Sequence, residues 1–225
     1  MSTVFIHVGQ AGNEVAGAFW QLAGAERPPK RWLFDERGHC RAVLIDTEPK
    51  VVRGVAASLG PEKLHARCAL VEQGGRGNNW AMGYHGADVG SGGIGMAEAA
   101  LEALRWQCER CDWCTGVMLC HSIGGGTGAG LGSRLLQEVR DAYPTQLITA
   151  ASLSPFAAGE LPLGFYNSVL ALSFLQERLG LGGRAWACEG LRGLALGEIR
   201  WDGVGWDRMQ CNAMQCDRIS LSLLS

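Results

Sequence analysis

The segment from Gly124 to Gly130, with the sequence GGGTGAG, restricts the possible folds more than any other part of the chain. Five of its seven residues are glycine. The apolar run Gly116–Cys120 precedes it and predicts a buried strand, while residues 131–143 have helical spacing. Glycine lets a ligand approach the backbone, and the free amides at the start of a helix attract anions. This order of elements predicts a site for a phosphate chain, with a simple flexible turn as the alternative.

Strand and helix patterns alternate along most of the chain. Apolar runs predict strands at 3–8, 40–46, 116–120 and 146–153. Helical spacing predicts helices at 9–24, 50–59, 96–111, 131–143 and 164–179. Such alternation is typical of an α/β fold, a Rossmann-like parallel sheet with helices on both faces. Polar or glycine-rich loops follow these strands, among them residues 74–86, so we expect the loops to meet at the carboxyl edge of the sheet, where such folds bind ligands.

The last part of the chain, residues 180–225, has a different character. It shows neither a strand period nor a helix period, and it repeats the letters MQC. We therefore expect one domain over residues 1–179 and a divergent or non-native tail over residues 180–225. The alternative is a loosely packed extension of the domain.

Composition limits the classes of partner. The 225 residues are 47% hydrophobic and 19% charged, with a formal net charge of −2, which suits a globular protein and gives no electrostatic reason to expect nucleic-acid binding. No run of 18 apolar residues and no signal-peptide pattern is present, so we expect neither a membrane span nor secretion. The nine cysteines are then expected to be reduced thiols in the cytoplasm.

Two common phosphate-binding motifs fit the chain poorly. The P-loop requires a Gly-Lys pair, and the sequence contains none. The dinucleotide pattern G-x-G-x-x-G starts at Gly124 and Gly126 but meets Ala129 where its third glycine should stand. An oxidoreductase with a dinucleotide-binding fold is therefore a weaker alternative.

The segment GGGTGAG resembles the signature loop of the tubulin family. Four further segments resemble tubulin loops in the same order along the chain, namely GQAGNEV at 9–15, DTEPKVV at 46–52, GRGNNWAMGYH at 75–85 and PFAAGELPLGFYNSVLALSFL at 155–175. Together these matches cover roughly residues 3–178. The resemblance implies a tubulin-type GTP-binding domain, in incomplete form.

Among tubulins, RAVLIDTEPKVV and the pattern around residues 155–175 most resemble delta-tubulin. That resemblance implies a cytoplasmic, cytoskeletal protein of centrioles, basal bodies and cilium assembly. Its partners would be other tubulin subunits or components of microtubules and centrioles. GTP hydrolysis would require a neighbouring subunit and regions absent from this sequence, so activity as an enzyme stays open. A division GTPase of the same superfamily and a non-functional tubulin fragment are the alternatives.

The resemblance also implies the ligands GTP and Mg²⁺ and gives each loop a role. Asp46 and Glu48 would approach the γ-phosphate and hold the water shell of Mg²⁺, although the residues alone fit helix caps equally well. Ala11 stands where the family usually has cysteine. The nucleotide would lie against Gln10, Ala11, Asn78, Ser122, Gly124, Gly125, Gly126, Thr127, Gly128, Ala129, Gly130 and Glu160.

Three cysteines raise a separate possibility. Cys108, Cys111 and Cys114 have C-x₂-C-x₂-C spacing, which occurs in zinc and iron–sulfur sites. However, the first two fall on a predicted helix, and no histidine stands nearby at the usual spacing. We expect unligated thiols, with a metal site as the alternative.

Overall fold

The computed structural model describes residues 2–60, 62–86, 95–154 and 162–179, together with three short strands further on. The described strands form one sheet in the order β3-β2-β1-β4-β5-β6-β7-β8. Their bounds are β1 Ser2–Val8, β2 Ala42–Asp46, β3 Ala69–Val71, β4 Cys114–Ser122, β5 Leu147–Ser154, β6 Ala185–Glu189, β7 Ala195–Ile199 and β8 Asn212–Gln215.

Neighbouring strands pair in parallel along the run β3-β2-β1-β4-β5-β6. At the far side of β6, the strands β7 and β8 add two antiparallel pairs. The chain moves outward from β1 to β2 and β3, and then returns to the other side of β1 with β4. The order of the strands therefore reverses between β1 and β4. In parallel α/β sheets, ligands bind beyond the carboxyl ends of the strands at such a reversal.

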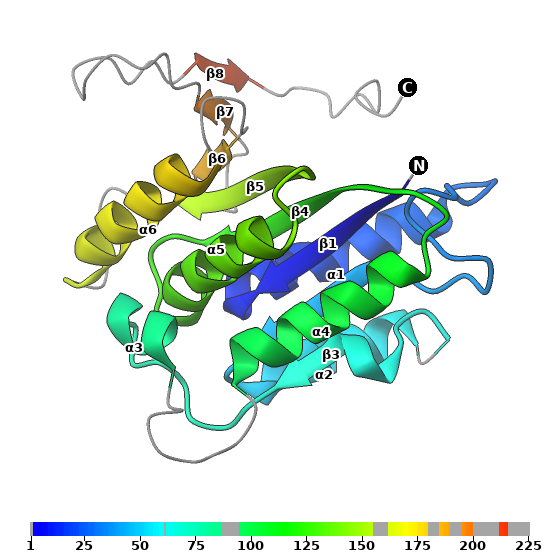
Figure 1. Ribbon diagram of the computed structural model, residues 1–225, viewed down its shortest axis with the longest axis horizontal. Helices are drawn as coiled ribbons and strands as arrows, with labels where there is room; N and C mark the ends of the chain where they lie inside the picture. The colour runs from blue at the N-terminus through cyan, green and yellow to red at the C-terminus, as the bar shows by residue number, and fades with distance from the viewer. Residues whose placement is uncertain are drawn as a thin grey trace.

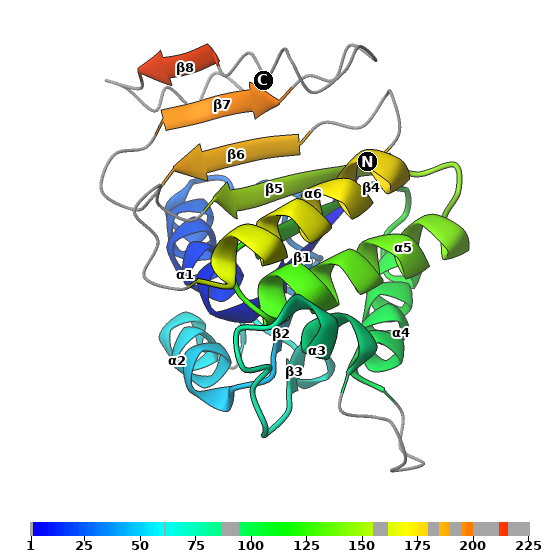
Figure 2. The ribbon, with the colours of Figure 1, turned by 90° about the vertical axis from the view of Figure 1, so that its left-hand side faces the viewer.

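Helices cover both faces of the sheet. The helices are α1 Gly9–Ala25, α2 Pro49–Leu59, α3 Trp80–His85, α4 Met96–Glu109, α5 Gly132–Ala142 and α6 Gly164–Leu179. One hydrophobic cluster joins the strands to α1 and α2, and a second joins them to α4, α5 and α6. Figure 1 shows α4 and α5 in front of the strands with α1 behind them, and Figure 2 shows the same layers after a quarter turn.

Alternation along β1 explains why the core has two halves. Val4, Ile6 and Val8 belong to the cluster under α4 and α5, whereas Phe5 belongs to the cluster under α1 and α2. Successive side chains of a strand point to opposite faces, so a continuous apolar strand is needed when both faces are covered. Trp20 of α1 packs edge-on against Phe5 at 5.3 Å between ring centroids.

The predicted fold class is confirmed, and the five predicted helices lie within a few residues of α1, α2, α4, α5 and α6. Two short elements were missed, the three-residue strand β3 and the helix α3, which lies inside the predicted loop 74–86. Residues 180–225, which show neither a strand period nor a helix period in the sequence, include the three short strands β6, β7 and β8. Whether that segment is divergent or non-native sequence stays a prediction. In the described part of the chain, no helix combines the length and apolarity that a membrane crossing requires.

Candidate functional site

The carboxyl ends of β1 and β4 meet in direct backbone contact. Gly9 follows β1 with φ of 74°, and a Cβ on it would lie 2.9 Å from the amide nitrogen of Gly128. A Cβ on Gly12, one turn further along α1, would lie 2.4 Å from the carbonyl oxygen of Cys120. Side chains do not fit in these two places, so glycine is what allows the first loop and the glycine-rich segment to touch.

The end of β2 joins the same group of loops. The hydroxyl oxygens of Thr47 and Thr127 are 2.6 Å apart, which links the second loop to the glycine-rich segment. The Asn13 amide of α1 donates to the carbonyl oxygens of Gly9 and Ile45 at 2.8 and 2.9 Å. These hydrogen bonds hold the ends of β1, β2 and β4 in one cluster.

The third loop closes over the glycine-rich segment. A Cβ on Gly126 would lie 2.8 Å from the carbonyl oxygen of Arg76 and 2.9 Å from the amide nitrogen of Asn79. A Cβ on Gly75 would lie 3.2 Å from Oε1 of Glu48, so the third loop also contacts the second. Asn78 adopts φ of 50°, a conformation that asparagine tolerates better than most residues.

Asn167 of α6 ties these loops together from the side. Its buried amide donates to the carbonyl oxygens of Asn78 and Gly124 at 2.7 and 3.0 Å. Its carbonyl oxygen accepts the backbone N–H of Trp80 at 2.9 Å. One side chain therefore fixes the third loop, the glycine-rich segment and the first residue of α3.

The glycine-rich segment is partly helical rather than a loop throughout. Residues Thr127–Leu131 form a π-helical turn that leads into α5. A Cβ on Gly130 would lie 2.1 Å from the carbonyl oxygen of Trp80, so the glycine lets α3 pack against this turn. The Gly130 amide already donates to Gly126 at 2.8 Å, and Ala129 lies in the core. Ala129 and Gly130 therefore have little free surface for the ligand contacts predicted for them.

Two buried histidines, His7 on β1 and His121 on β4, hydrogen bond to the backbone of the segments that follow these strands. Trp20 donates to Nε2 of His7 at 3.2 Å, which leaves Nδ1 to donate to the carbonyl oxygen of Gly12 at 3.1 Å. In the same way, Ser152 donates to Nε2 of His121 at 2.9 Å, and Nδ1 donates to the carbonyl oxygen of Gly128 at 2.8 Å. Each neutral imidazole thus joins a strand end to the first turns of α1 or α5.

Stability should fall as the pH is lowered through the range of these histidines. Burial lowers the pKa of His7 and of His121 from 6.5 to about 4. The unfolded chain therefore binds more protons between pH 6.5 and 4, and this should cost on the order of 3 kcal/mol for each histidine. Asp46, whose pKa is raised, opposes the loss in part. Urea unfolding between pH 7 and 4 measures the net effect.

The variant His121→Asn sharpens this pH test. Asparagine keeps a donor near Nδ1 but does not titrate, so the slope of unfolding free energy against pH should become flatter. A slope that is equally steep in His121→Asn and in the parent protein would contradict the assignment.

Asp46, at the end of β2, is a buried carboxyl group with a raised pKa. Only 3% of its surface is exposed, and Oδ2 has no hydrogen-bond partner, while Oδ1 accepts the N–H of Glu48 at 3.3 Å. Burial raises the pKa of Asp46 to about 6, although the amides of Glu48 and Thr47 act in the opposite direction. A carboxylate with one free oxygen beside the exposed Glu48 suits a hydrated Mg²⁺, which would compensate the buried charge.

The other predicted residues lie around this cluster. Gln10, Glu48 and Asn78 are exposed, and Ala11, Ser122, Gly125 and Thr127 are half-buried, so their surfaces are open to a ligand. Glu160 lies outside the described residues. The sequence analysis missed Thr47, His121 and Asn167 as parts of the site; only the position of His121 at the end of a predicted strand gave a signal.

The three cysteines of the C-x₂-C-x₂-C motif lie around the connection between α4 and β4. Cys108 lies in the last turn of α4, Cys111 lies on the connection after this helix, and Cys114 is the first residue of β4. Within the described residues, no three histidine, cysteine or carboxylate side chains are placed to hold a metal ion. The described cysteines form no disulfide, and their role as unligated thiols stays a prediction.

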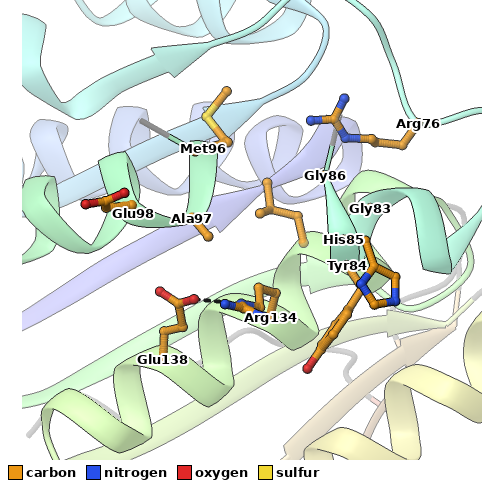
Figure 3. Close-up of a pocket in the computed structure, with 12 residues that line it drawn as sticks. Arg76, Gly83, Tyr84, His85, Gly86, Met96, Ala97, Glu98, Arg134 and Glu138 are labelled. Carbon is orange, nitrogen blue, oxygen red and sulfur yellow. Dashed lines mark hydrogen bonds and ion pairs between the residues drawn. The ribbon is translucent and has the colours of Figure 1, made fainter. Parts of the chain in front are cut away.

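A separate cavity of about 350 Å³ lies between α3, α4 and α5. Figure 3 shows Arg134 and Glu138, one turn apart on α5, joined at 2.6 Å along one wall of this cavity. Arg134 also lies over the ring of Tyr84 at 5.7 Å. No residue predicted to bind nucleotide is among those that line the cavity. The cavity is therefore distinct from the strand-end site.

Comparison with known proteins agrees with this geometry. Residues 2–181 match the family described as "Tubulin/FtsZ family, GTPase domain". The tubulin beta-3 chain of Echinococcus multilocularis is 30% identical over 200 residues, which are 77% of this chain and 43% of that protein. The tubulin beta-6 chain of Ectocarpus variabilis is 31% identical over 195 residues, which are 77% of this chain and 42% of that protein. The chain thus spans less than half the length of these relatives.

Proposed function

Because this chain belongs to the Tubulin/FtsZ family through its GTPase domain, we propose that its strand ends bind GTP together with Mg²⁺. The observation that carries this proposal is the backbone contact of Gly9 with Gly128, which brings the loops after β1 and β4 together where the strand order reverses. Helix starts at such a reversal favour a phosphate chain. Proteins of this family bind GTP with Mg²⁺, whereas a dinucleotide-dependent oxidoreductase would need a third glycine where this chain has Ala129.

In this proposal the predicted nucleotide-binding residues divide into three roles. The glycine-rich segment from Ser122 to Gly128 wraps the α- and β-phosphates with its amides. Asp46 and Glu48 hold the water shell of Mg²⁺ near the γ-phosphate, with Asn78 on the other side. Gln10 and Ala11 lie by the phosphates and base, and Glu160 belongs near the ribose. Hydrolysis is not part of the proposal, because the family-type reaction requires a neighbouring subunit.

Thermal melting with competing nucleotides tests the ligand. GTP with Mg²⁺ at 100 times its dissociation constant should stabilise the protein by about 2.7 kcal/mol, which corresponds to roughly 5–10 °C for a chain of this size. EDTA should remove most of that gain, because the buried Asp46 would again lack a cation. Protection by NAD⁺ without protection by GTP would overturn the proposal in favour of the oxidoreductase.

The variant Gly125→Val separates ligand binding from folding. No atom lies within 4 Å of a Cβ placed on Gly125, so the variant should melt at the parent temperature without nucleotide. Its added side chain would occupy space next to the phosphates, and GTP affinity should fall at least about tenfold, or 1.4 kcal/mol. Equal GTP protection of parent and variant would place the ligand elsewhere.

We further propose a cytoskeletal role like that of delta-tubulin, in the cytoplasm and at centrioles and basal bodies. The support is the segment RAVLIDTEPKVV, of which β2 is a part, and the pattern at residues 155–175. Partners would be other tubulin subunits or centriole components. A fluorescent fusion in a ciliated cell should gather at centrioles; even decoration of all microtubules would favour an ordinary microtubule subunit.

Residues 180–225 are proposed to be divergent or non-native sequence beyond the nucleotide-binding domain of residues 1–179. The family match ends at residue 181, which supports this division. Sequencing of the transcript tests it. A reading frame that continues with tubulin-like helices after residue 179 would identify the chain as a truncated product, whereas a transcript that encodes residues 180–225 as given would show that the segment is native.

A further inference from the structure

Three thiols lie in contact at the amino edge of the sheet, away from the strand-end site. The sulfur atoms of Cys108, at the end of α4, and Cys114, at the start of β4, are 3.4 Å apart. Cys111 lies on the short connection between these two elements and hydrogen bonds to Cys114. Cys114 therefore has a thiol on either side of it.

The connection that carries these cysteines is held firmly to the sheet. Ser2 donates its backbone N–H to the carbonyl oxygen of Trp113 at 2.8 Å, and Thr115 donates its hydroxyl to the carbonyl oxygen of Ser2 at 3.0 Å. Arg41 donates to the carbonyl oxygen of Arg110 at 3.3 Å. The contact between Cys108 and Cys114 is thus set by the backbone on both sides of it.

We propose that Cys108 and Cys114 form a reversible intramolecular disulfide that fastens the end of α4 to the start of β4. A disulfide places its sulfurs about 2.05 Å apart, so the two thiols need to approach by only about 1.4 Å. Both side chains are half-buried, whereas Cys40, Cys68 and Cys120 are buried. A small oxidant can therefore reach this pair, and the half-buried Cys111, but not Cys40, Cys68 or Cys120.

The local hydrogen bonds give the two thiols different roles. The hydrogen bond between Cys108 and Cys114 lowers the pKa of the Cys108 thiol. Hydrogen bonding to Cys114 and burial raise the pKa of the Cys111 thiol. Since the thiolate is the attacking form, Cys108 attacks first and Cys111 stays protonated. Cys114, already in contact, resolves the intermediate.

The oxidant in this scheme is a low-molecular-weight disulfide such as oxidised glutathione. The Cys108 thiolate attacks one of its sulfurs, the bond between the two glutathione sulfurs breaks, and one glutathione leaves and takes up a proton. Cys114 then gives up its proton and attacks the Cys108 sulfur, which releases the second glutathione. Two protein thiols are oxidised, and one small disulfide is reduced to two thiols.

Mass spectrometry of the full chain tests this pairing. The protein is equilibrated with oxidised and reduced glutathione in graded ratios, alkylated with N-ethylmaleimide, and digested with trypsin without reduction. Cleavage after Arg105, Arg110 and Arg134 puts Cys108 on one peptide and the other three nearby cysteines, Cys111, Cys114 and Cys120, on the next. The expected product is these two peptides joined through Cys108 and Cys114, and dithiothreitol should separate them.

Two conservative variants make the result specific. Cys114→Ser should abolish the joined peptides, whereas Cys111→Ser should retain them, and circular dichroism checks that both variants are folded. A bond from Cys108 to Cys111, joined peptides that persist in Cys114→Ser, or glutathione attached to Cys108 with no joined peptides would each overturn the proposal. Nucleotide protection is not involved, so the proposed function and this pairing succeed or fail independently.

Discussion

Gly130→Ala is expected to disrupt the packing between α3 and the π-helical turn. It should lower the free energy of unfolding by at least about 3 kcal/mol. A Cβ at this position would lie 2.1 Å from the carbonyl oxygen of Trp80 and 2.6 Å from the amide nitrogen of Tyr84. Both are backbone atoms of α3, so no side-chain rotation can relieve the overlap. Thermal melting should show a loss of roughly 6–12 °C.

Gly54→Ala is the matched control for this prediction. Gly54 lies within α2 and has no atom within 4 Å of a Cβ placed on it. Alanine favours helix more than glycine, so this variant should gain about 0.4–1 kcal/mol. Opposite signs for the two substitutions would show that close packing, and not helix propensity, selects glycine at residue 130. A Gly130→Ala protein as stable as its parent would mean that α3 does not pack there.

Asn167→Ala should cost about 3–4 kcal/mol and weaken GTP binding as well. The variant removes three hydrogen bonds and leaves the N–H of Trp80 and the carbonyl oxygens of Asn78 and Gly124 without their partner. Each buried group left unpaired costs about 1–3 kcal/mol. Urea unfolding measures the stability, and GTP titration measures the binding.

Two neighbouring substitutions test the reason given for Asn167. Asn167→Asp keeps an acceptor for Trp80 but places a buried charge beside two carbonyl oxygens, so it should be unstable at neutral pH and recover as the pH falls and the carboxyl is protonated. Ser168→Ala removes one hydroxyl, which lies 2.8 Å from the carbonyl oxygen of Gly164 in the same helix and 3.4 Å from that of Ile123, and should cost less than about 1 kcal/mol. Equal losses for Ala at residues 167 and 168 would contradict the bridging role.

The sequence predicts the layers of this fold well because their periodicity is local. Residues 164–179 show helical spacing and form α6 over that range, and the apolar runs mark β1, β2, β4 and β5. By contrast, α3 has six residues and lies among glycines and asparagines, which favour turns when read alone. It is helical because Asn79 caps its first turn and because Gly83 and Gly130 allow it to pack on the turn beneath.

The candidate site divides in the same way. Its glycines could be predicted because a glycine-rich segment between a strand and a helix has few other uses. Asn167 could not be, although it shares the buried face of α6 with Ala171 and Leu175, because it gains its role only when α6 folds against loops 43 and 89 residues away in the chain. The pairing of Thr47 with Thr127 likewise depends on contacts across 80 residues.

The two buried histidines help to set the distance between the helix starts that follow β1 and β4. His7 lies on β1 and His121 on the neighbouring β4, and each imidazole holds the first turns of one helix. Parallel strands lie about 4.8 Å apart. The distance between β1 and β4 therefore sets the distance between the two helix starts that follow them. The loops proposed to bind the nucleotide are therefore fixed in place before any ligand arrives, so binding costs little backbone freedom.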